Sequence, residues 1–122
     1  MSYGNLSKNF NVREFSCKCC GLTIIEPRLV KLLQQLRDLY NIPMQVNCST
    51  RCYEHNEKIG SNENSLHLCG WAADVTFIGH PMHEFDKSLK KLHDEWQWGG
   101  LGTYAAKNFA HFDVGRIRTW EG

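Results

Sequence analysis

The strongest constraint on the fold is an amphipathic helical pattern over residues 27–40, followed at once by the pattern of a strand. Apolar residues recur there at the spacing of one helix face, and Pro27 suits a first helical turn. Asn41 and Pro43 end the pattern. From residue 44 to 49, apolar and polar residues alternate, which is typical of a strand with one buried face. This pairing of elements favours a helix packed on a sheet.

The rest of the chain shows the same two patterns of apolar residues, the helical spacing and the alternation of a strand. A second amphipathic pattern places Phe85, Leu89, Leu92 and Trp96 on one helix face. The order of elements predicts an α+β fold, with helices packed on a small, mostly antiparallel sheet. The further expected elements are a short helix over 53–59 ended by Gly60, a loop over 61–66, a strand over 72–77, a helix over 82–96, a loop or bulged strand around Gly99, Gly100 and Gly102, and a last strand over 109–114.

Length and charge narrow the class of protein. At 122 residues the chain suits one domain, which we place at residues 1–122. With 14 basic and 13 acidic residues the net charge is +1, which gives no electrostatic reason to expect nucleic acid or an anionic membrane as a partner. No segment approaches the roughly 18 apolar residues of a membrane helix. The first residues lack the pattern of a signal peptide, so we expect synthesis in the cytoplasm, and we expect a monomer.

Titratable residues interrupt two of the apolar strand patterns. Asp74 lies between Ala73 and Val75, and His111 lies in the last predicted strand. A carboxylate in such a place is costly unless it is paired or binds a metal. His67 ends the polar loop seven residues before Asp74, and two histidines with one carboxylate are a common set of ligands for catalytic zinc. The spacing alone leaves open a plain loop histidine at 67 and a hydrogen-bonded core histidine at 111.

A longer motif surrounds these residues. Residues 65–74 read SLHLCGWAAD, which resembles the S-x-H-x-x-G-x-A-x-D motif of the zinc D-alanyl-D-alanine peptidases. These cell-wall enzymes share their core fold with the hedgehog signalling domain. Other segments resemble further elements of that family, its small phage and bacterial members included, in the same order along the chain. They are FNVREFSCKCCG at 10–21, STRCYEHN at 49–56, GLGTY at 100–104, HFDVG at 111–115 and RTW at 118–120.

The resemblance implies a role for individual residues. His67, Asp74 and His111 match the three ligands of the zinc ion (Zn2+). Arg51 matches the arginine that binds the substrate's terminal carboxylate or orients its carbonyl, which suits the forked guanidinium. Ser65 matches a serine that lines the substrate pocket. The alternatives are a surface ion pair for Arg51 and a turn-capping hydroxyl for Ser65.

One position departs from the family pattern. Several members carry Glu or Asp three residues before the last histidine ligand, where it acts as general base, and this chain has Asn108 there. An amide cannot take that proton. Asp113 shares a strand face with His111, about 7 Å away along the strand, and is our first candidate for the base. The alternative is that Asp113 accepts a hydrogen bond from the ligand histidine and fixes its tautomer. Behind it, we consider His55 and Glu63.

Six cysteines and four tryptophans need separate interpretation. With no signal peptide, we expect mostly buried, reduced thiols rather than disulfides. The alternative is a structural metal held by the C-x-x-C of Cys17 and Cys20, with Cys52 joining through the fold. The four tryptophans, at 71, 96, 98 and 120, could line a groove for a sugar or peptide. Helical spacing places Trp96 in the core, and Trp71 and Trp98 are the better groove candidates.

These features together predict a zinc peptidase that acts on the peptide stems of peptidoglycan. It is expected to be a D,D-carboxypeptidase, or an L,D- or D,D-endopeptidase. Because no signal peptide is seen, the chain would reach the wall as a phage lysin released with assistance or as part of a virion. The alternative from another class is a zinc-stabilised binding module without turnover, as the hedgehog domain exemplifies.

Overall fold

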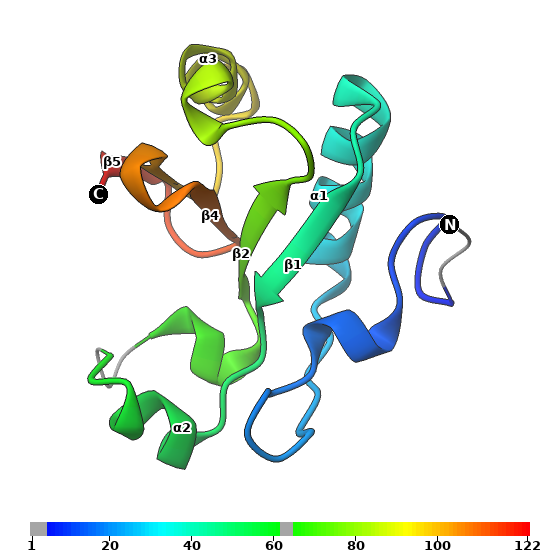
Figure 1. Ribbon diagram of the computed structural model, residues 1–122, viewed down its shortest axis with the longest axis vertical. Coiled ribbons are helices and arrows are strands. Elements are labelled where there is room, and N and C mark those ends of the chain that lie inside the picture. Colours follow the sequence, from blue (N-terminus) through cyan, green and yellow to red (C-terminus); the bar gives the residue numbers. More distant parts are fainter. Residues whose placement is uncertain (1–4, 62–64) are drawn as a thin grey trace.

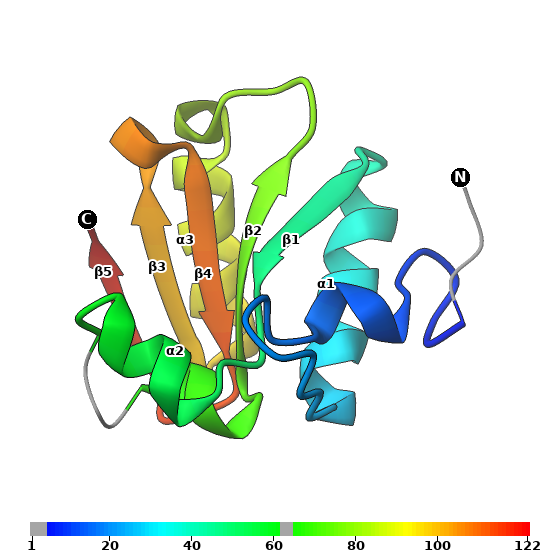
Figure 2. The same cartoon turned by 60° about the horizontal axis from the view of Figure 1, so that its bottom comes forward.

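The fold is one mixed sheet with two long helices against one of its faces. A computed structural model describes residues 5–61 and 65–122. The sheet has five strands in the order β1-β2-β4-β3-β5; all neighbours are antiparallel except β3 and β5, which are parallel. In Figures 1 and 2, α1 and α3 lie on the same side of the sheet, and α2 lies on the other. The elements are η1 (Val12–Phe15), α1 (Pro27–Tyr40), β1 (Met44–Cys48), α2 (Tyr53–Lys58), η2 (Leu66–Cys69), β2 (Ala72–Phe77), η3 (Met82–Glu84), α3 (Asp86–Trp96), β3 (Gly100–Tyr104), η4 (Ala105–Lys107), β4 (Phe109–Asp113) and β5 (Arg118–Glu121).

Helix α1 begins and ends where its sequence signals stand. The Glu26 side chain accepts a hydrogen bond from the backbone N–H of Arg28, and Pro27 fills the first turn. Asn41 ends the helix in the left-handed conformation, at φ 54°. The face at residues 29, 30, 32, 33 and 36 is buried against the sheet.

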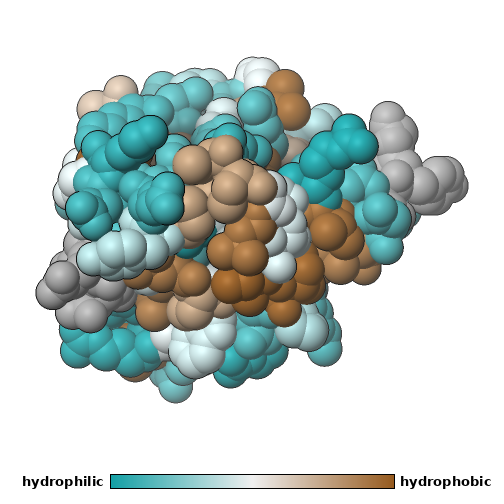
Figure 3. Space-filling view, turned by 90° about the horizontal axis from the view of Figure 1, so that it is seen from below, coloured by the Kyte–Doolittle hydropathy of each residue, from teal (hydrophilic) through white to brown (hydrophobic). Residues whose placement is uncertain are grey.

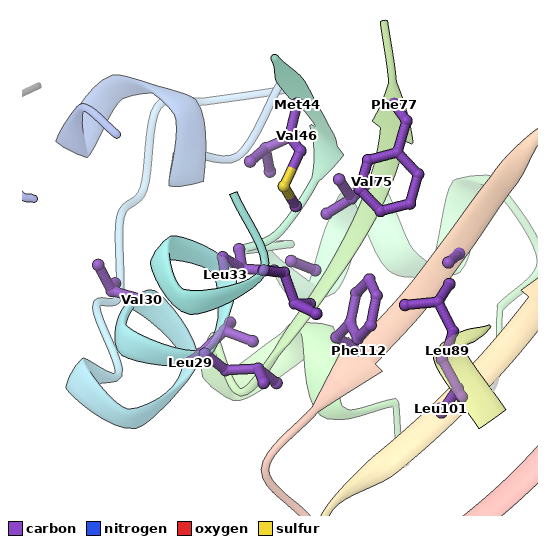
Figure 4. Packing of buried hydrophobic residues seen from close by; sticks show 14 of the residues in the cluster. Leu29, Val30, Leu33, Met44, Val46, Val75, Phe77, Leu89, Leu101 and Phe112 are labelled. Carbon is purple, nitrogen blue, oxygen red and sulfur yellow. The ribbon is translucent and has the colours of Figure 1, made fainter. Parts of the chain in front are cut away.

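Strand alternation divides the sheet into an apolar face and a polar face. Ala73 lies opposite Phe112 and Val75 opposite Ala110, and all four are fully buried under the helices. Figure 4 shows Leu29 and Leu33 of α1 and Leu89 of α3 around Val75 and Phe112 of the sheet. Since neighbouring residues of a strand point to opposite sides, the residues between them face away from the helices. The core therefore lies on one side only, and the other side is free to carry a site.

The predicted α+β class and mostly antiparallel sheet are confirmed, while one helix, one strand and one loop differ from the prediction. The helix predicted over 82–96 is split, because Phe85 has φ −108° and closes a 3-10 turn before α3 begins. Strand β5 was not predicted: it is a short edge strand with no fully buried residue, so it lacks an apolar alternation. The glycine segment forms the regular strand β3. Of the loop predicted over 61–66, residues 62–64 lie outside the described part, and Leu66 already belongs to η2.

None of the helices among the described residues is long and apolar enough to cross a lipid bilayer.

A pair of leucines on α1 tests the one-sided core. Leu33 is fully buried, whereas Leu39 is 61% exposed on the same helix. Leu33→Ala should lower the free energy of unfolding by about 2–5 kcal/mol, because it leaves a cavity. Leu39→Ala makes the same chemical change and should stay within about 0.5 kcal/mol of the parent. Urea unfolding of both variants gives the comparison, and equal losses would contradict the proposed packing.

Candidate metal centre

The pairing of β2 with β4 brings the two central residues of the site together. Asp74 lies directly opposite His111 in this antiparallel pair, on the face away from the helices. The Nδ1 atom of His111 lies 3.0 Å from Oδ1 of Asp74. Both strands are interior strands of the sheet, so this distance is fixed by the backbone ladder.

His67 reaches the same carboxylate from outside the sheet. It lies in the 3-10 turn η2. The backbone N–H of His67 is at the start of this turn, and it donates a hydrogen bond to Ser65 Oγ at 3.2 Å. The Nδ1 of His67 lies 2.8 Å from the carbonyl oxygen of Ser49. A carbonyl can only accept, so Nδ1 carries the proton and Nε2 keeps a free lone pair. That Nε2 lies 3.4 Å from Asp74 Oδ1.

Asp113 holds the far side of His111. Its Oδ2 lies 2.7 Å from Nε2 of His111, so this nitrogen donates and Nδ1 is left to face Asp74. Arg118 donates to both oxygens of Asp113, at 3.0 and 2.7 Å, and the backbone N–H groups of Gly100 and Gly115 donate to Oδ1. The Asp113 side chain is fully buried. Each carboxylate oxygen of Asp113 therefore already accepts at least two hydrogen bonds.

Charges in this cluster are strongly coupled. Burial opposes ionisation of Asp74, but hydrogen bonds from His111 and His67 hold the pKa of this carboxyl well below its usual range. Burial also disfavours the charged form of His67, yet hydrogen bonds to Asp74 and Cys48 raise the pKa of this imidazole to about 9. The pKa of His111 is raised by Asp113 and Asp74 against its own burial. Without a metal, the centre therefore attracts positive charge, which a divalent cation can supply in place of protons.

The donor set fits a zinc ion. Nε2 of His67 and Nδ1 of His111 both lie next to Oδ1 of Asp74, and each histidine is oriented by a hydrogen bond from its other ring nitrogen. Two imidazoles and one carboxylate, each held by an outer partner, are a frequent arrangement at catalytic zinc. The three residues predicted as ligands are thus brought together by the fold.

Cys48 is a neighbour of the site that the sequence pattern missed. The alternation of Met44, Val46 and Cys48 predicts that Cys48 lies on the helix-covered face. A bulge at Asn47 inserts one residue between Val46 and Cys48 and reverses that face. Cys48 then lies opposite Asp74, and its Sγ is 3.8 Å from His67 Nδ1. The Cys48, His67 and Asp74 ligand atoms all lie within 4.8 Å of one another.

A cavity of about 760 Å³ opens over the centre. Arg51 and Ser65 line it, and so does Trp120 of β5, which belongs to the RTW segment and is one of the four tryptophans considered for a groove. Trp71 and Trp98, expected to line a groove, are absent from the described lining. The further lining residues are Ile59, Ser61, Leu66, His67, Asp74, Tyr104, Lys107, Phe109, His111 and Arg118.

Arg51 is buried, at 6% exposure, and its backbone N–H donates to the carbonyl of His67 at 2.9 Å. Among the described residues its Nε has no hydrogen-bond partner and no acidic side chain forms an ion pair with it. A buried guanidinium with a spare donor at the edge of a cavity is suited to bind an oxygen-rich ligand. The surface ion pair considered for Arg51 is not what the structure describes.

Two glycines of β3 make room for the wall of the cavity. Gly102 pairs with both His111 and Trp120, and a Cβ on it would lie 2.4 Å from the Trp120 ring. The indole can therefore lie across β3, with its centroid 5.1 Å from that of His111, and its N–H donates to the Tyr104 hydroxyl. A Cβ on Gly100 would likewise lie 2.5 Å from an oxygen of Asp113.

The remaining candidates for a general base do not face the centre or are not described. Asn108 adopts φ 61° after η4, and its Oδ1 accepts from the backbone N–H of Met82 at 2.8 Å. Asn108 therefore stabilises the turn and does not act at the centre. His55 lies on α2 and is not among the described lining residues, and Glu63 lies outside the described part of the chain. Asp74 is the one acidic residue among the described residues that line the cavity.

Comparison with known proteins agrees with the geometry. The family described as Peptidase M15 matches residues 8–113, which include all three candidate ligands. A curated relative, the probable peptidoglycan L,D-endopeptidase MepK of Haemophilus influenzae, is 34% identical over 89 residues. That match covers 69% of this chain and 46% of the relative, so the chain spans just under half of the relative's length. No solved structure matches the chain significantly. On the extent of the family match, this chain belongs to the M15 family of peptidases.

Proposed function

We propose that this chain is a zinc-dependent peptidase that cleaves peptide bonds in the stems or cross-links of peptidoglycan. The observation that carries the proposal is the convergence of His67, Asp74 and His111 at the base of a cavity that also contains Arg51. Membership of a peptidase family supports it. The name of the relative makes an L,D-endopeptidase reaction the first to test, ahead of D,D-endopeptidase and D,D-carboxypeptidase reactions.

The residues of the site would have separate roles. His67, Asp74 and His111 hold the metal, and a bound zinc ion supplies the Lewis acidity that polarises a carbonyl and acidifies water. The outer hydrogen bonds to Ser49 and Asp113 keep the two imidazoles in the tautomers that leave their inner nitrogens free.

We assign Asp113 to positioning rather than to proton transfer. A general base must reach the attacking water and have a free lone pair. Asp113 accepts five hydrogen bonds from His111, Arg118, Gly100 and Gly115, and its side chain has no exposed surface. The pKa of its carboxyl also lies well below the ordinary range because these donors outweigh its burial. It therefore suits the alternative role, in which it orients His111.

Arg51 and Ser65 are proposed to face the substrate. The guanidinium has a buried donor to offer, which suits a terminal carboxylate or a stem-peptide carbonyl. Ser65 lines the same cavity while its Oγ caps the turn that carries His67, so both roles considered for it are compatible. We further propose that the protein acts at the cell wall as a monomer, either as a lysin released with assistance or as part of a virion.

A second candidate function is a zinc-stabilised wall-binding module without turnover. The observation in its favour is that Asn108 occupies the position of the family's base, and that the described lining has no carboxylate besides Asp74. Turnover on defined muropeptides separates this candidate from the peptidase.

The first prediction concerns the metal. The purified protein should bind zinc at this centre and release peptides from purified peptidoglycan, and a chelator should abolish the release. His111→Ala should lose both the centre's zinc and the activity, because removal of one ligand leaves too few donors. Elemental analysis and separation of the muropeptide products measure the two effects. Zinc binding without any product would favour the binding module, and no zinc at this centre would contradict both functions.

The second prediction separates the two roles of Asp113. If it positions His111, Asp113→Asn should weaken zinc binding by roughly ten- to a hundredfold, and activity should return when zinc is added in excess. A lost base would instead leave zinc bound and lower kcat by about a hundredfold or more at every zinc concentration. Asp94→Asn, an exposed change on α3, is the matched control.

The third prediction concerns Arg51. Arg51→Ala should lower kcat/KM by at least about thirtyfold, because loss of one partner of a buried charged hydrogen bond costs about 2 kcal/mol or more. Zinc content should be unchanged, since Arg51 contributes only its backbone N–H to His67. Steady-state kinetics and thermal unfolding, run on the same preparation, decide the matter. A large fall in the thermal midpoint with kcat/KM intact would assign Arg51 to the fold.

A further inference from the structure

A second group of metal-binding side chains lies apart from the candidate metal centre. The thiols of Cys17, Cys20 and Cys52 all lie within 4.8 Å of one another. Cys17 and Cys20 belong to the loop after η1, and Cys52 caps the N-terminus of α2. This loop lies beside the segment that joins β1 to α2 in both views of the chain (Figures 1 and 2).

The local backbone turns the loop thiols toward Cys52. The N–H of Gly21 donates to the carbonyl of Cys17 at 2.9 Å, and Gly21 takes φ 81°, so the chain reverses directly after Cys20. The backbone N–H of Cys52 donates to Cys17 Sγ at 3.3 Å, and that of His55 donates to Cys52 Sγ at 3.4 Å. Backbone donors aimed at sulfur stabilise the thiolate form that metals bind.

Cys19 is the candidate for a fourth thiol. It lies between Cys17 and Cys20 in the loop and is exposed, and its pKa is raised chiefly by the neighbouring Cys52 thiol. Lys58, at the end of α2, supplies a positive charge that acts on Cys19 in the opposite sense. The expectation of buried thiols fails here, since Cys17 alone of the six is buried, and all six are free.

Mutual proximity of this kind distinguishes a metal site from a disulfide. A disulfide joins two sulfurs and leaves the others out, whereas Cys17, Cys20 and Cys52 each have two sulfur neighbours within 4.8 Å. Four cysteines with one C-x-x-C spacing match the thiolate set of tetrahedral structural zinc sites. We propose that Cys17, Cys20, Cys52 and Cys19 bind a structural zinc ion, separate from the ion at His67, Asp74 and His111.

The proposed ion would tie the N-terminal segment to the wall of the cavity. Cys52 follows Arg51, and the neighbouring Thr50 N–H already donates to the carbonyl of Phe15 at 3.0 Å. A metal ion bound by Cys52 and the loop would hold the two segments together at this contact, and would thereby fix the backbone of Arg51. Figure 3 shows this end of the molecule from below, with hydrophobic residues gathered across its middle and hydrophilic ones around them. The site does not depend on the proposed peptidase activity.

The test begins with the unmodified protein, purified under reducing conditions with zinc present. Elemental analysis should give two equivalents of zinc per chain, and a thiol-blocking mercurial should release one of them to a zinc-sensitive dye. His111→Ala should keep the releasable equivalent. If blocking the thiols releases no zinc, or if the intact mass shows a disulfide within the group, the proposal is overturned.

Single substitutions locate the ligands. Cys20→Ser changes an exposed thiol and should lose the releasable zinc, while Cys69→Ser, also an exposed thiol, should keep it. In the cobalt-substituted protein, a thiolate-to-cobalt charge-transfer band should persist in Cys48→Ser and His111→Ala and weaken in Cys20→Ser. A band lost with Cys48 but kept in Cys20→Ser would assign the thiolate to the candidate metal centre and refute the second site.

Discussion

The rest of the structure depends on the register between β2 and β4. One pairing sets Ala73 against Phe112 under the helices and, one residue along, Asp74 against His111 on the opposite face. A slip of a single residue would exchange the two faces, burying the carboxylate among leucines and exposing the phenylalanine. Core packing and ligand geometry are therefore specified by the same interaction, and neither can change without the other.

The buried charge of Asp113 is tolerated because its oxygens have partners. Asp113 is fully enclosed, yet Arg118 forms a two-point contact with it, and His111 and two backbone N–H groups complete its hydrogen bonds. Such a network is costly to leave half made. The small residues of β3 belong to the same arrangement, since Gly100 leaves the volume that the Asp113 carboxylate and Arg118 occupy.

Much of this arrangement could be predicted from sequence, for reasons that also explain the failures. Helix α1 was predicted at its correct ends because its caps and its apolar period agree. The three candidate ligands were found because a titratable residue in an apolar strand is conspicuous, and because a family motif surrounds them. Cys48 was missed because a bulge reverses its face, which no period reveals. Strand β5 was missed because an edge strand carries no apolar alternation. Trp120 was considered for a groove, but Trp71 and Trp98 were preferred to it, because the glycine on the neighbouring strand that makes room for its ring is seen only in the fold.

Two of the three candidate ligands lie in the interior of the sheet, whereas much of the cavity wall lies outside it. Asp74 and His111 stand on the interior strands β2 and β4, where both neighbours fix the backbone. Much of the cavity wall comes instead from the edge strand β5, short 3-10 turns and the ends of α2. Wall residues that do not contact a candidate ligand, such as Lys107, can change the shape and charge of the cavity without altering the backbone under Asp74 and His111. An architecture of this kind allows the cavity to be reshaped from its rim while the sheet beneath it keeps one fixed geometry.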